Sequence, residues 1–120
     1  MALVYTRSTL EVSQIAKISH KNRVLVVPFS GGSSLEGNFS APDRGISIDF
    51  AYMDNILALH EDDLDVVVQP SAQWMELNGK RMDSGLFFPV DPGPSAKVGG
   101  MVNTSCSGTI AVRYGTMKTG

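Results

Sequence analysis

The sequence predicts an α+β fold, and three observations support this prediction. A strand–helix–strand order occupies the first 28 residues and favours parallel strands, because parallel strands need a long crossover, usually a helix. Two later apolar stretches, residues 56–60 and 65–69, are separated only by a short acidic turn and predict a hairpin. A βαβ start followed by a hairpin favours an α+β fold over a purely parallel sheet.

Five short stretches are expected to form strands. Arg23–Val27 is rich in β-branched residues and is closed by Pro28. The acidic residues Glu61–Asp63 interrupt the last two stretches and provide the hairpin turn. In chain order, the expected strands are Leu3–Tyr5, Arg23–Val27, Ile46–Phe50, Ile56–His60 and Asp65–Gln69.

A capping signal places the first helix. Ser8 is followed three residues later by Glu11, which is the spacing of a capping box, in which each side chain accepts a hydrogen bond from the other residue's N–H. The helix is expected to end at Asn22. One helical stripe is predicted to carry Val12, Ile15, Ala16 and Ser19.

A second helix is expected over Ala72–Asp83, with Ser71 as its N-cap. Gly85 lies where a left-handed residue is needed after the helix. A further short helix is predicted near Gly99–Thr104. The residues that can share one face of the second helix are Trp74, Met75 and Met82.

Composition excludes several classes of protein. The 120 residues allow one domain of average size, and 42% of them are apolar, as in globular proteins. A net charge of −2 without a run of Lys or Arg argues against nucleic-acid binding. The longest apolar stretches are far shorter than the roughly 20 residues of a membrane span, so we expect no transmembrane segment. One Cys excludes an internal disulfide framework.

The segment Phe29–Gly37, which we call the glycine loop, follows a predicted strand directly. Glycines reach positive φ, so the N–H groups of such a loop can converge on an anion. Gly32 and Gly37 have P-loop spacing, but Asn38 and Phe39 stand where Lys and Ser/Thr are required. The loop therefore predicts a lysine-free cradle that holds a pyrophosphate without transferring it, with a plain surface loop as the alternative.

A second segment, Asp91–Gly115, is rich in small residues, and we call it the small-residue segment. Small side chains allow the backbone to approach a large flat ligand. The two segments lie about 60 residues apart and could close on one elongated ligand from both sides. The alternative is a Gly/Ser-rich loop without a ligand.

Two other candidates have simpler explanations. Cys106 is a candidate nucleophile or cofactor tether, but it has no nearby His and no C-x-x-C partner, so a structural thiol is favoured. His60 with the following acidic residues is a candidate metal site. Consecutive turn residues diverge, however, so a solvated hairpin is favoured.

Several motifs follow one another in a specific order and spacing. They include VYTRSTLEV at Val4–Val12, SGGSSLEG at Ser30–Gly37, HEDDLDVVVQPS at His60–Ser71, SGLFFPVDPGPSAKVGGMVNTSCSG at Ser84–Gly108 and VRYGTMK at Val112–Lys118. Together they resemble the flavin-binding domain of the vanillyl-alcohol oxidase/p-cresol methylhydroxylase family, and within it the mitochondrial, cytochrome-c-linked D-lactate dehydrogenases. The resemblance covers essentially the whole chain. It implies an FAD-binding type-2 (p-cresol methylhydroxylase-like) domain, with an N-terminal βαβ subdomain and the start of a second subdomain.

The resemblance also implies residue roles. The serines and glycines of the glycine loop would hold the FAD pyrophosphate, and the small-residue segment would line the dinucleotide and the isoalloxazine ring. The implied cofactor-binding residues are Ser30, Gly31, Gly32, Ser33, Ser34, Gly37, Pro92, Pro94, Ser95, Gly99, Gly100, Met101, Thr104, Ser107, Gly108, Tyr114 and Gly115.

Departures from the family pattern refine these roles. Ser33 lies in the neighbourhood where some relatives place a flavin-tethering His, so we expect non-covalent FAD. Asn38 replaces a common His. Ser105 and Ile110 replace common Asn residues, which removes an amide from the surroundings of the flavin.

The family oxidises D-2-hydroxy acids by moving a hydride equivalent to the flavin, and its electrons leave to cytochrome c. The resemblance therefore implies oxidation of D-lactate to pyruvate in the mitochondrion. Residues 1–120 are expected to be a partial FAD-binding domain, inactive alone, without the substrate domain, its catalytic and metal-binding residues or the targeting segment. The alternatives are the FAD domain of another D-2-hydroxyacid or glycolate dehydrogenase or of an aldonolactone oxidase, and a non-catalytic remnant.

Overall fold

A computed structural model describes residues 2–35, 37, 40 and 44–118, but not the side chains of residues 81 and 82. Asn38, Phe39 and the side chain of Met82, which entered the predictions above, lie outside this description.

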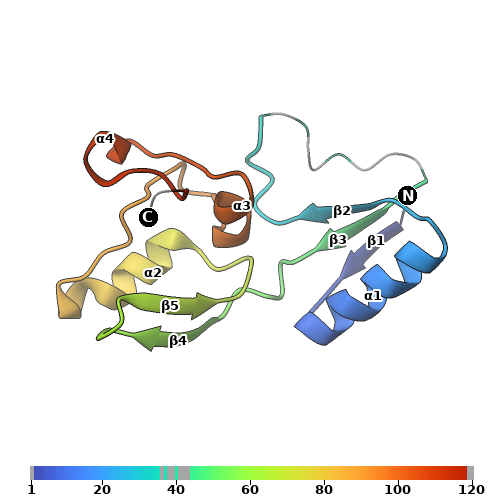
Figure 1. The fold of residues 1–120 in the computed structure, drawn as a ribbon, viewed down its shortest axis with the longest axis horizontal. Coiled ribbons are helices and arrows are strands. Elements are labelled where there is room, and N and C mark those ends of the chain that lie inside the picture. The colour runs from blue at the N-terminus through green and yellow to red at the C-terminus, as the bar shows by residue number, and fades with distance from the viewer. Residues whose placement is uncertain (1, 36, 38–39, 41–43, 119–120) are drawn as a thin grey trace.

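A three-stranded parallel sheet lies in the N-terminal half of the molecule (Figure 1). Its strands are β1 (Ala2–Tyr5), β2 (Val26–Phe29) and β3 (Ile46–Asp49), in the order β1–β3–β2. β3 pairs with both neighbours, so that Ile48 lies opposite Val4 on one side and Pro28 on the other. β1 and β2 run parallel, as the strand–helix–strand order predicts, but they do not pair with each other, because β3 lies between them.

β2 differs in its bounds from the prediction. It begins at Val26 instead of Arg23 and continues through Pro28. The Leu25 carbonyl accepts a hydrogen bond from the Ile46 N–H at the start of β3, and the Phe29 carbonyl accepts one from the Phe50 N–H just after β3. Because strand backbone groups alternate in direction, Pro28 faces away from β3 at this edge, where a missing N–H breaks no pairing with β3.

Helix α1 (Thr9–Lys21) connects β1 and β2 and has the predicted N-cap. The Glu11 N–H donates to Ser8 Oγ at 3.2 Å. The Glu11 carboxylate accepts from the Arg7 N–H at 2.6 Å, one residue before the expected partner Ser8. On the predicted stripe, Ser19 is buried but Ala16 is exposed.

The C-terminus of α1 explains why the strand begins late. Arg23 has a φ of +54°. Its N–H donates to His20 O at 3.1 Å, and the Val24 N–H donates to Ser19 O at 2.9 Å. This is a Schellman motif with Arg23 at the left-handed position, so Arg23 ends the helix and does not open the strand.

A hairpin follows, as predicted. β4 (Ile56–His60) pairs antiparallel with β5 (Asp65–Val68), and His60 lies opposite Asp65 across the turn. β5 ends one residue before the expected Gln69.

Helix α2 (Trp74–Arg81) continues as the 3-10 helix η1 (Met82–Ser84). The predicted start at Ala72 and the predicted N-cap at Ser71 are wrong, because α2 begins at Trp74. In α2, Leu77 is buried, at 1% exposure, whereas Met75 is 51% exposed. Gly85 has the expected positive φ of +74°.

Helix α3 (Val98–Asn103) confirms the short helix predicted near Gly99–Thr104. It also ends in a Schellman motif. Ser105 has a φ of +50°, its N–H donates to Val102 O at 3.1 Å, and the Cys106 N–H donates to Met101 O at 2.9 Å. Helix α4 (Ala111–Tyr114) was not predicted.

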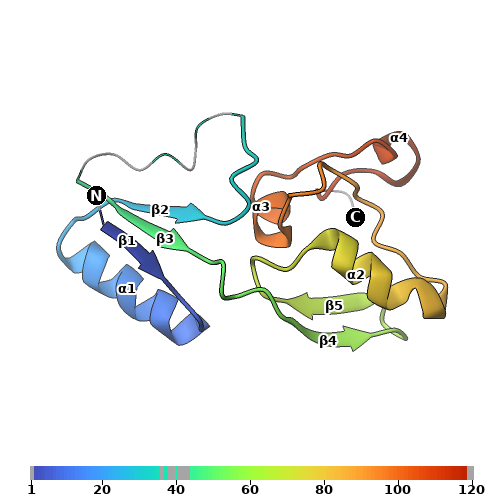
Figure 2. The same ribbon diagram turned by 180° about the vertical axis from the view of Figure 1, so that it is seen from behind.

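Two halves lie side by side along the 48 Å axis of the molecule. The sheet and α1 form one half, while the hairpin and α2 to α4 form the other (Figures 1 and 2). In the second half, Val90, Ala96 and Met101 form a buried cluster, against which Trp74, Phe88, Cys106 and Met117 pack.

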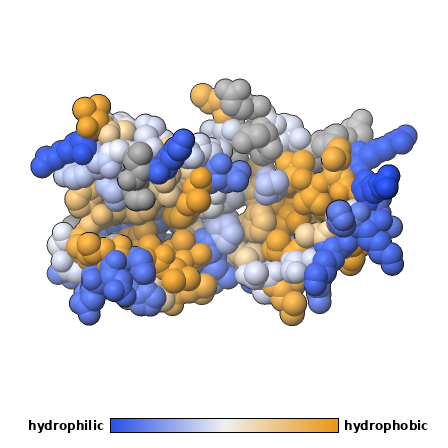
Figure 3. Space-filling view, in the orientation of Figure 1, coloured by the Kyte–Doolittle hydropathy of each residue, from blue (hydrophilic) through white to orange (hydrophobic). Residues whose placement is uncertain are grey.

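Apolar side chains also reach the surface of both halves (Figure 3). They include Leu3 and Tyr5 of β1 and Leu57 and Val67 of the hairpin. No helix in the described part of the chain has the length and apolar character of a membrane span.

Candidate functional site

The glycine loop and the small-residue segment meet between the two halves of the molecule. A Cβ at Gly31 would lie 2.7 Å from the Ser95 carbonyl oxygen and 3.2 Å from Lys97 Cγ. Only glycine fits at this contact, because real Cβ atoms do not come so close to a carbonyl oxygen. Two segments that are far apart in sequence are thereby fixed against each other.

A hydroxyl pair holds the start of the glycine loop. Ser30 Oγ lies 2.7 Å from Ser71 Oγ, and Ser71 is only 3% exposed. If Ser71 donates in this pair, the Ser30 hydroxyl keeps its proton for an anion in the loop. Sequence reasoning assigned Ser71 to a helix cap and so missed this contact, and no local pattern indicates it.

The rest of the glycine loop has the backbone freedom that the prediction requires. Gly32 has a φ of +62° and Gly37 a φ of +67°. Ser33 is exposed, and Ser34 is half-buried. The loop therefore presents small polar residues near the ends of β2 and α3.

Helix α3 packs tightly against the segment after β5. The Gly99 N–H donates to Pro70 O at 2.8 Å, and a Cβ at Gly99 would lie 2.9 Å from Pro70 Cβ. A Cβ at Gly100, by contrast, would meet nothing within 4 Å. Gly99 therefore serves the packing of the protein, while Gly100 leaves open space for a ligand.

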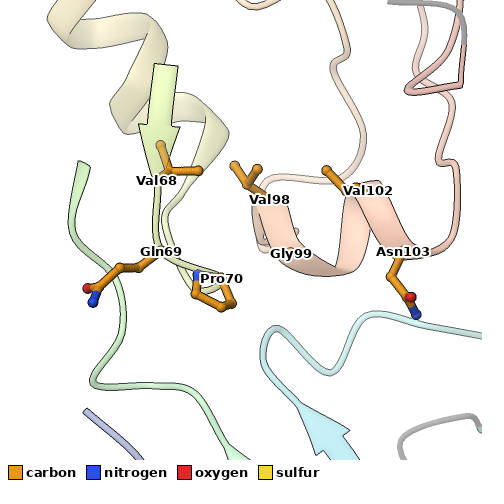
Figure 4. A pocket seen from close by; sticks show the side chains of 7 residues that line it. All are labelled: Val68, Gln69, Pro70, Val98, Gly99, Val102 and Asn103. Carbon is orange, nitrogen blue, oxygen red and sulfur yellow. The ribbon is translucent and has the colours of Figure 1, made fainter. Parts of the chain in front are cut away.

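An open hollow of about 410 Å³ lies beside this contact. Figure 4 shows its largely apolar wall, with Val98 and Val102 of α3 facing the end of β5. The lining residues are Val68, Gln69, Pro70, Val98, Gly99, Val102 and Asn103.

A second open hollow, of about 510 Å³, contains four of the predicted residues, namely Pro92, Pro94, Ser107 and Gly108. Asp91 holds its two sides together. The Asp91 carboxylate accepts hydrogen bonds from the Thr109 hydroxyl and, at 3.1 Å, from the Ile110 N–H. These bonds, with that of Thr109 first, lower the pKa of Asp91 below its usual value.

Helix α2 holds the proline-rich part of this hollow in place. Trp74 Nε1 donates to Gly93 O at 3.3 Å. Asn78 forms a two-way clamp on the backbone of Phe88, accepting from its N–H at 2.5 Å and donating to its carbonyl at 3.3 Å.

The remaining predicted residues are less uniform. Met101 is buried in the core cluster, so only its backbone can approach a ligand. The Thr104 hydroxyl donates to Gly100 O at 2.8 Å. The Tyr114 ring packs edge-to-face on Phe87 at 5.1 Å, next to Gly115, whose φ is +83°.

The structure describes the surroundings of the two minor candidates. Cys106 packs against the core cluster, and burial raises the pKa of its thiol. His60 Nδ1 lies 2.5 Å from Asp65 Oδ1 on the exposed hairpin. Within the described residues, no three His, Cys, Asp or Glu side chains gather as metal ligands would.

Comparison with known proteins yields a consistent result. The family model described as an FAD binding domain matches residues 1–119. The chain is 49% identical to a mitochondrial D-lactate dehydrogenase (cytochrome) of Arabidopsis thaliana, over 97% of this chain and 20% of that protein. It is 46% identical to a probable mitochondrial D-lactate dehydrogenase of Danio rerio, over 97% of this chain and 23% of that protein. The chain thus spans about a fifth of the length of these relatives.

Solved structures share the fold. Alkyldihydroxyacetonephosphate synthase superimposes with a TM-score of 0.85 at 26% identity, covering 97% of this chain and 24% of that chain. The 6-hydroxy-D-nicotine oxidase of Arthrobacter nicotinovorans has a TM-score of 0.83 at 17% identity, covering 98% of this chain and 25% of that one.

Proposed function

The chain belongs to the family of FAD-binding domains, and on that premise we propose that its glycine loop and small-residue segment hold FAD without a covalent bond. The observation that carries this proposal is the contact of Gly31 with Ser95 and Lys97. It joins the loop expected to bind the pyrophosphate to the segment expected to line the rest of the cofactor.

The residues present fit such a ligand. Glycines at positive φ let the loop's N–H groups turn towards an anion, and Ser30 adds a hydroxyl beside Ser71. The open side of Gly100 leaves room for a group close to the backbone. The hollow between Pro92 and Gly108 is open, and the bonds of Asp91 fix its wall, so it suits a flat ring.

We further propose that the protein serves the oxidation of D-lactate to pyruvate in the mitochondrion, with electrons passing to cytochrome c. The names of the relatives from plant and fish support the reaction and the location, and the name of the plant relative supports the electron acceptor. Bound FAD supplies the redox chemistry by accepting a hydride equivalent from the hydroxy acid. The part of this chain is to bind the cofactor, orient it and exclude water from one side of it.

A matched pair of helical glycines tests the binding site. Gly100 and Gly79 both lie exposed in helices, and a Cβ at either position meets nothing within 4 Å. Gly100→Glu should weaken FAD binding about tenfold or more, a loss of about 1.4 kcal/mol. Gly79→Glu should leave binding unchanged. Flavin fluorescence titration measures both dissociation constants.

Two results would contradict the proposal. If the unsubstituted chain fails to bind FAD, the function is wrong. If Gly100→Glu and Gly79→Glu bind FAD equally well, the site is misplaced. Gly32→Glu is a poorer test, because the φ of +62° at Gly32 would strain any side chain.

A further inference from the structure

Lys97 lies beside the glycine loop, although the sequence predicts a cradle without lysine. Its Cγ is 3.2 Å from the Cβ position of Gly31. Its backbone forms a bridge with Gln73, and its carbonyl accepts from the Met101 N–H at 3.0 Å, so the residue is anchored at the start of α3. The side chain is half-buried. The stem of the lysine is therefore packed along the loop.

The charge of Lys97 has no acidic partner in the part of the chain that the structure describes. The ion pairs found there join His60 to Asp65 and Lys80 to Glu76. The backbone N–H groups and serine hydroxyls of the glycine loop are neutral donors. A diphosphate in this loop would be held by dipoles alone unless a cation came from another segment.

We propose that Lys97 supplies the cationic contact for the diphosphate of FAD, reaching the glycine loop from the small-residue segment. This inference rests on the proposed function of the same site. A lysine ammonium is a mobile point charge and needs no fixed fork geometry, so it can follow a phosphate that the backbone has already positioned. Lys97 is a binding residue in this proposal and takes no part in the redox step.

Substitutions that keep the stem but change the charge test the proposal. Lys97→Met retains an apolar stem beside Gly31 and should weaken FAD binding about tenfold or more, as the loss of one charge-assisted contact predicts. Lys97→Arg should restore binding to within about threefold of the unsubstituted chain, since it keeps the charge. Lys80→Met is the matched control, because Lys80 is exposed on α2 and pairs with Glu76 at 3.2 Å.

Two further readouts separate charge from packing. Riboflavin lacks phosphates, so its affinity should be the same for the unsubstituted chain and for Lys97→Met. Added salt should weaken FAD binding to the unsubstituted chain more than to Lys97→Met, because screening acts on the charge. Urea denaturation of each variant shows whether the fold is retained.

The outcomes distinguish this inference from the proposed function. Failure of the unsubstituted chain to bind FAD overturns both. Binding of FAD by the unsubstituted chain and by Lys97→Met with equal affinity overturns the role of Lys97 alone. Equal losses of FAD and riboflavin affinity in Lys97→Met also overturn it, since they show a packing effect.

Discussion

Gly99 and Gly100 are neighbours in α3, but alanine at the two positions is predicted to change stability in opposite directions. Either replacement exchanges a helical glycine for alanine, and this exchange stabilises a helix by about 1 kcal/mol. A Cβ at Gly100 meets nothing within 4 Å. Gly100→Ala should therefore raise the free energy of unfolding by about 1 kcal/mol.

At Gly99 the new methyl group collides with the backbone. Its Cβ would lie 2.9 Å from Pro70 Cβ and 3.0 Å from Pro70 O. Relieving this contact stretches the 2.8 Å hydrogen bond from the Gly99 N–H to Pro70 O. Overpacking costs about 1–3 kcal/mol and the bond about 1 kcal/mol. After the helix gain, Gly99→Ala should lower the free energy of unfolding by about 1–3 kcal/mol.

Urea denaturation provides the assay. Trp74 is the single tryptophan and packs against the core cluster that contains Met101 of α3, so its fluorescence reports this part of the fold. Gly79→Ala in α2 is the control for the helix gain. Equal midpoint shifts for Gly99→Ala and Gly100→Ala would refute the reasoning, because they would show that the contact with Pro70 does not restrict position 99.

Three other predictions follow from single residues. Arg23→Gly and Ser105→Gly should each raise the free energy of unfolding, measured in urea, by about 0.5–1 kcal/mol, because both residues occupy left-handed Schellman positions. An unchanged free energy of unfolding in either variant would contradict the left-handed conformation at that position. Because the pKa of Asp91 is lowered in the folded protein, its carboxylate stabilises the fold above its usual pKa of 3.8, and this stability is lost as the pH falls through the folded pKa. In Asp91→Asn, the urea midpoint should therefore fall less between about pH 6 and about pH 3 than it does in the unsubstituted chain. An equal fall in both proteins would refute this prediction. Ser19→Ala should raise the melting temperature and the free energy of unfolding, the latter by about 1 kcal/mol, because the buried Ser19 Oγ has no hydrogen-bond partner among the described residues. A lower melting temperature would contradict this prediction and indicate that the hydroxyl has a partner.

Local signals were sufficient where neighbouring residues decide the structure. Ser8 and Glu11 cap α1 within four residues of each other, and the acidic turn joins β4 to β5 at the predicted position. The same signals failed at Arg23, because β-branched neighbours suggested a strand while the helix needed that residue for its left-handed end. The insertion of β3 between β1 and β2 depends on pairing across the whole half and has no local signature.

In the candidate site, too, some features follow from local sequence and others depend on the tertiary fold. The composition of the two glycine-rich segments indicated a ligand, and the structure brings Gly31 against Ser95. Composition could not distinguish the packing glycine Gly99, whose Cβ would meet Pro70, from Gly100, whose Cβ would meet nothing. That difference depends on which atoms of the folded protein lie next to each Cα. Ser71 and Lys97 reach the loop only through the tertiary fold.

The central position of β3 also bears on how the chain folds as it is synthesised. β1 and β2 make their hydrogen bonds to β3 and none to each other. When the ribosome has released residues 1–29, both strands and α1 exist as sequence, but no ladder can form until Ile46–Asp49 has emerged. Until then, the apolar residues of β1, α1 and β2 remain exposed, and this exposed surface is a binding target for chaperones. Both ladders of this half depend on the same strand, β3, so neither can form before β3 has been synthesised.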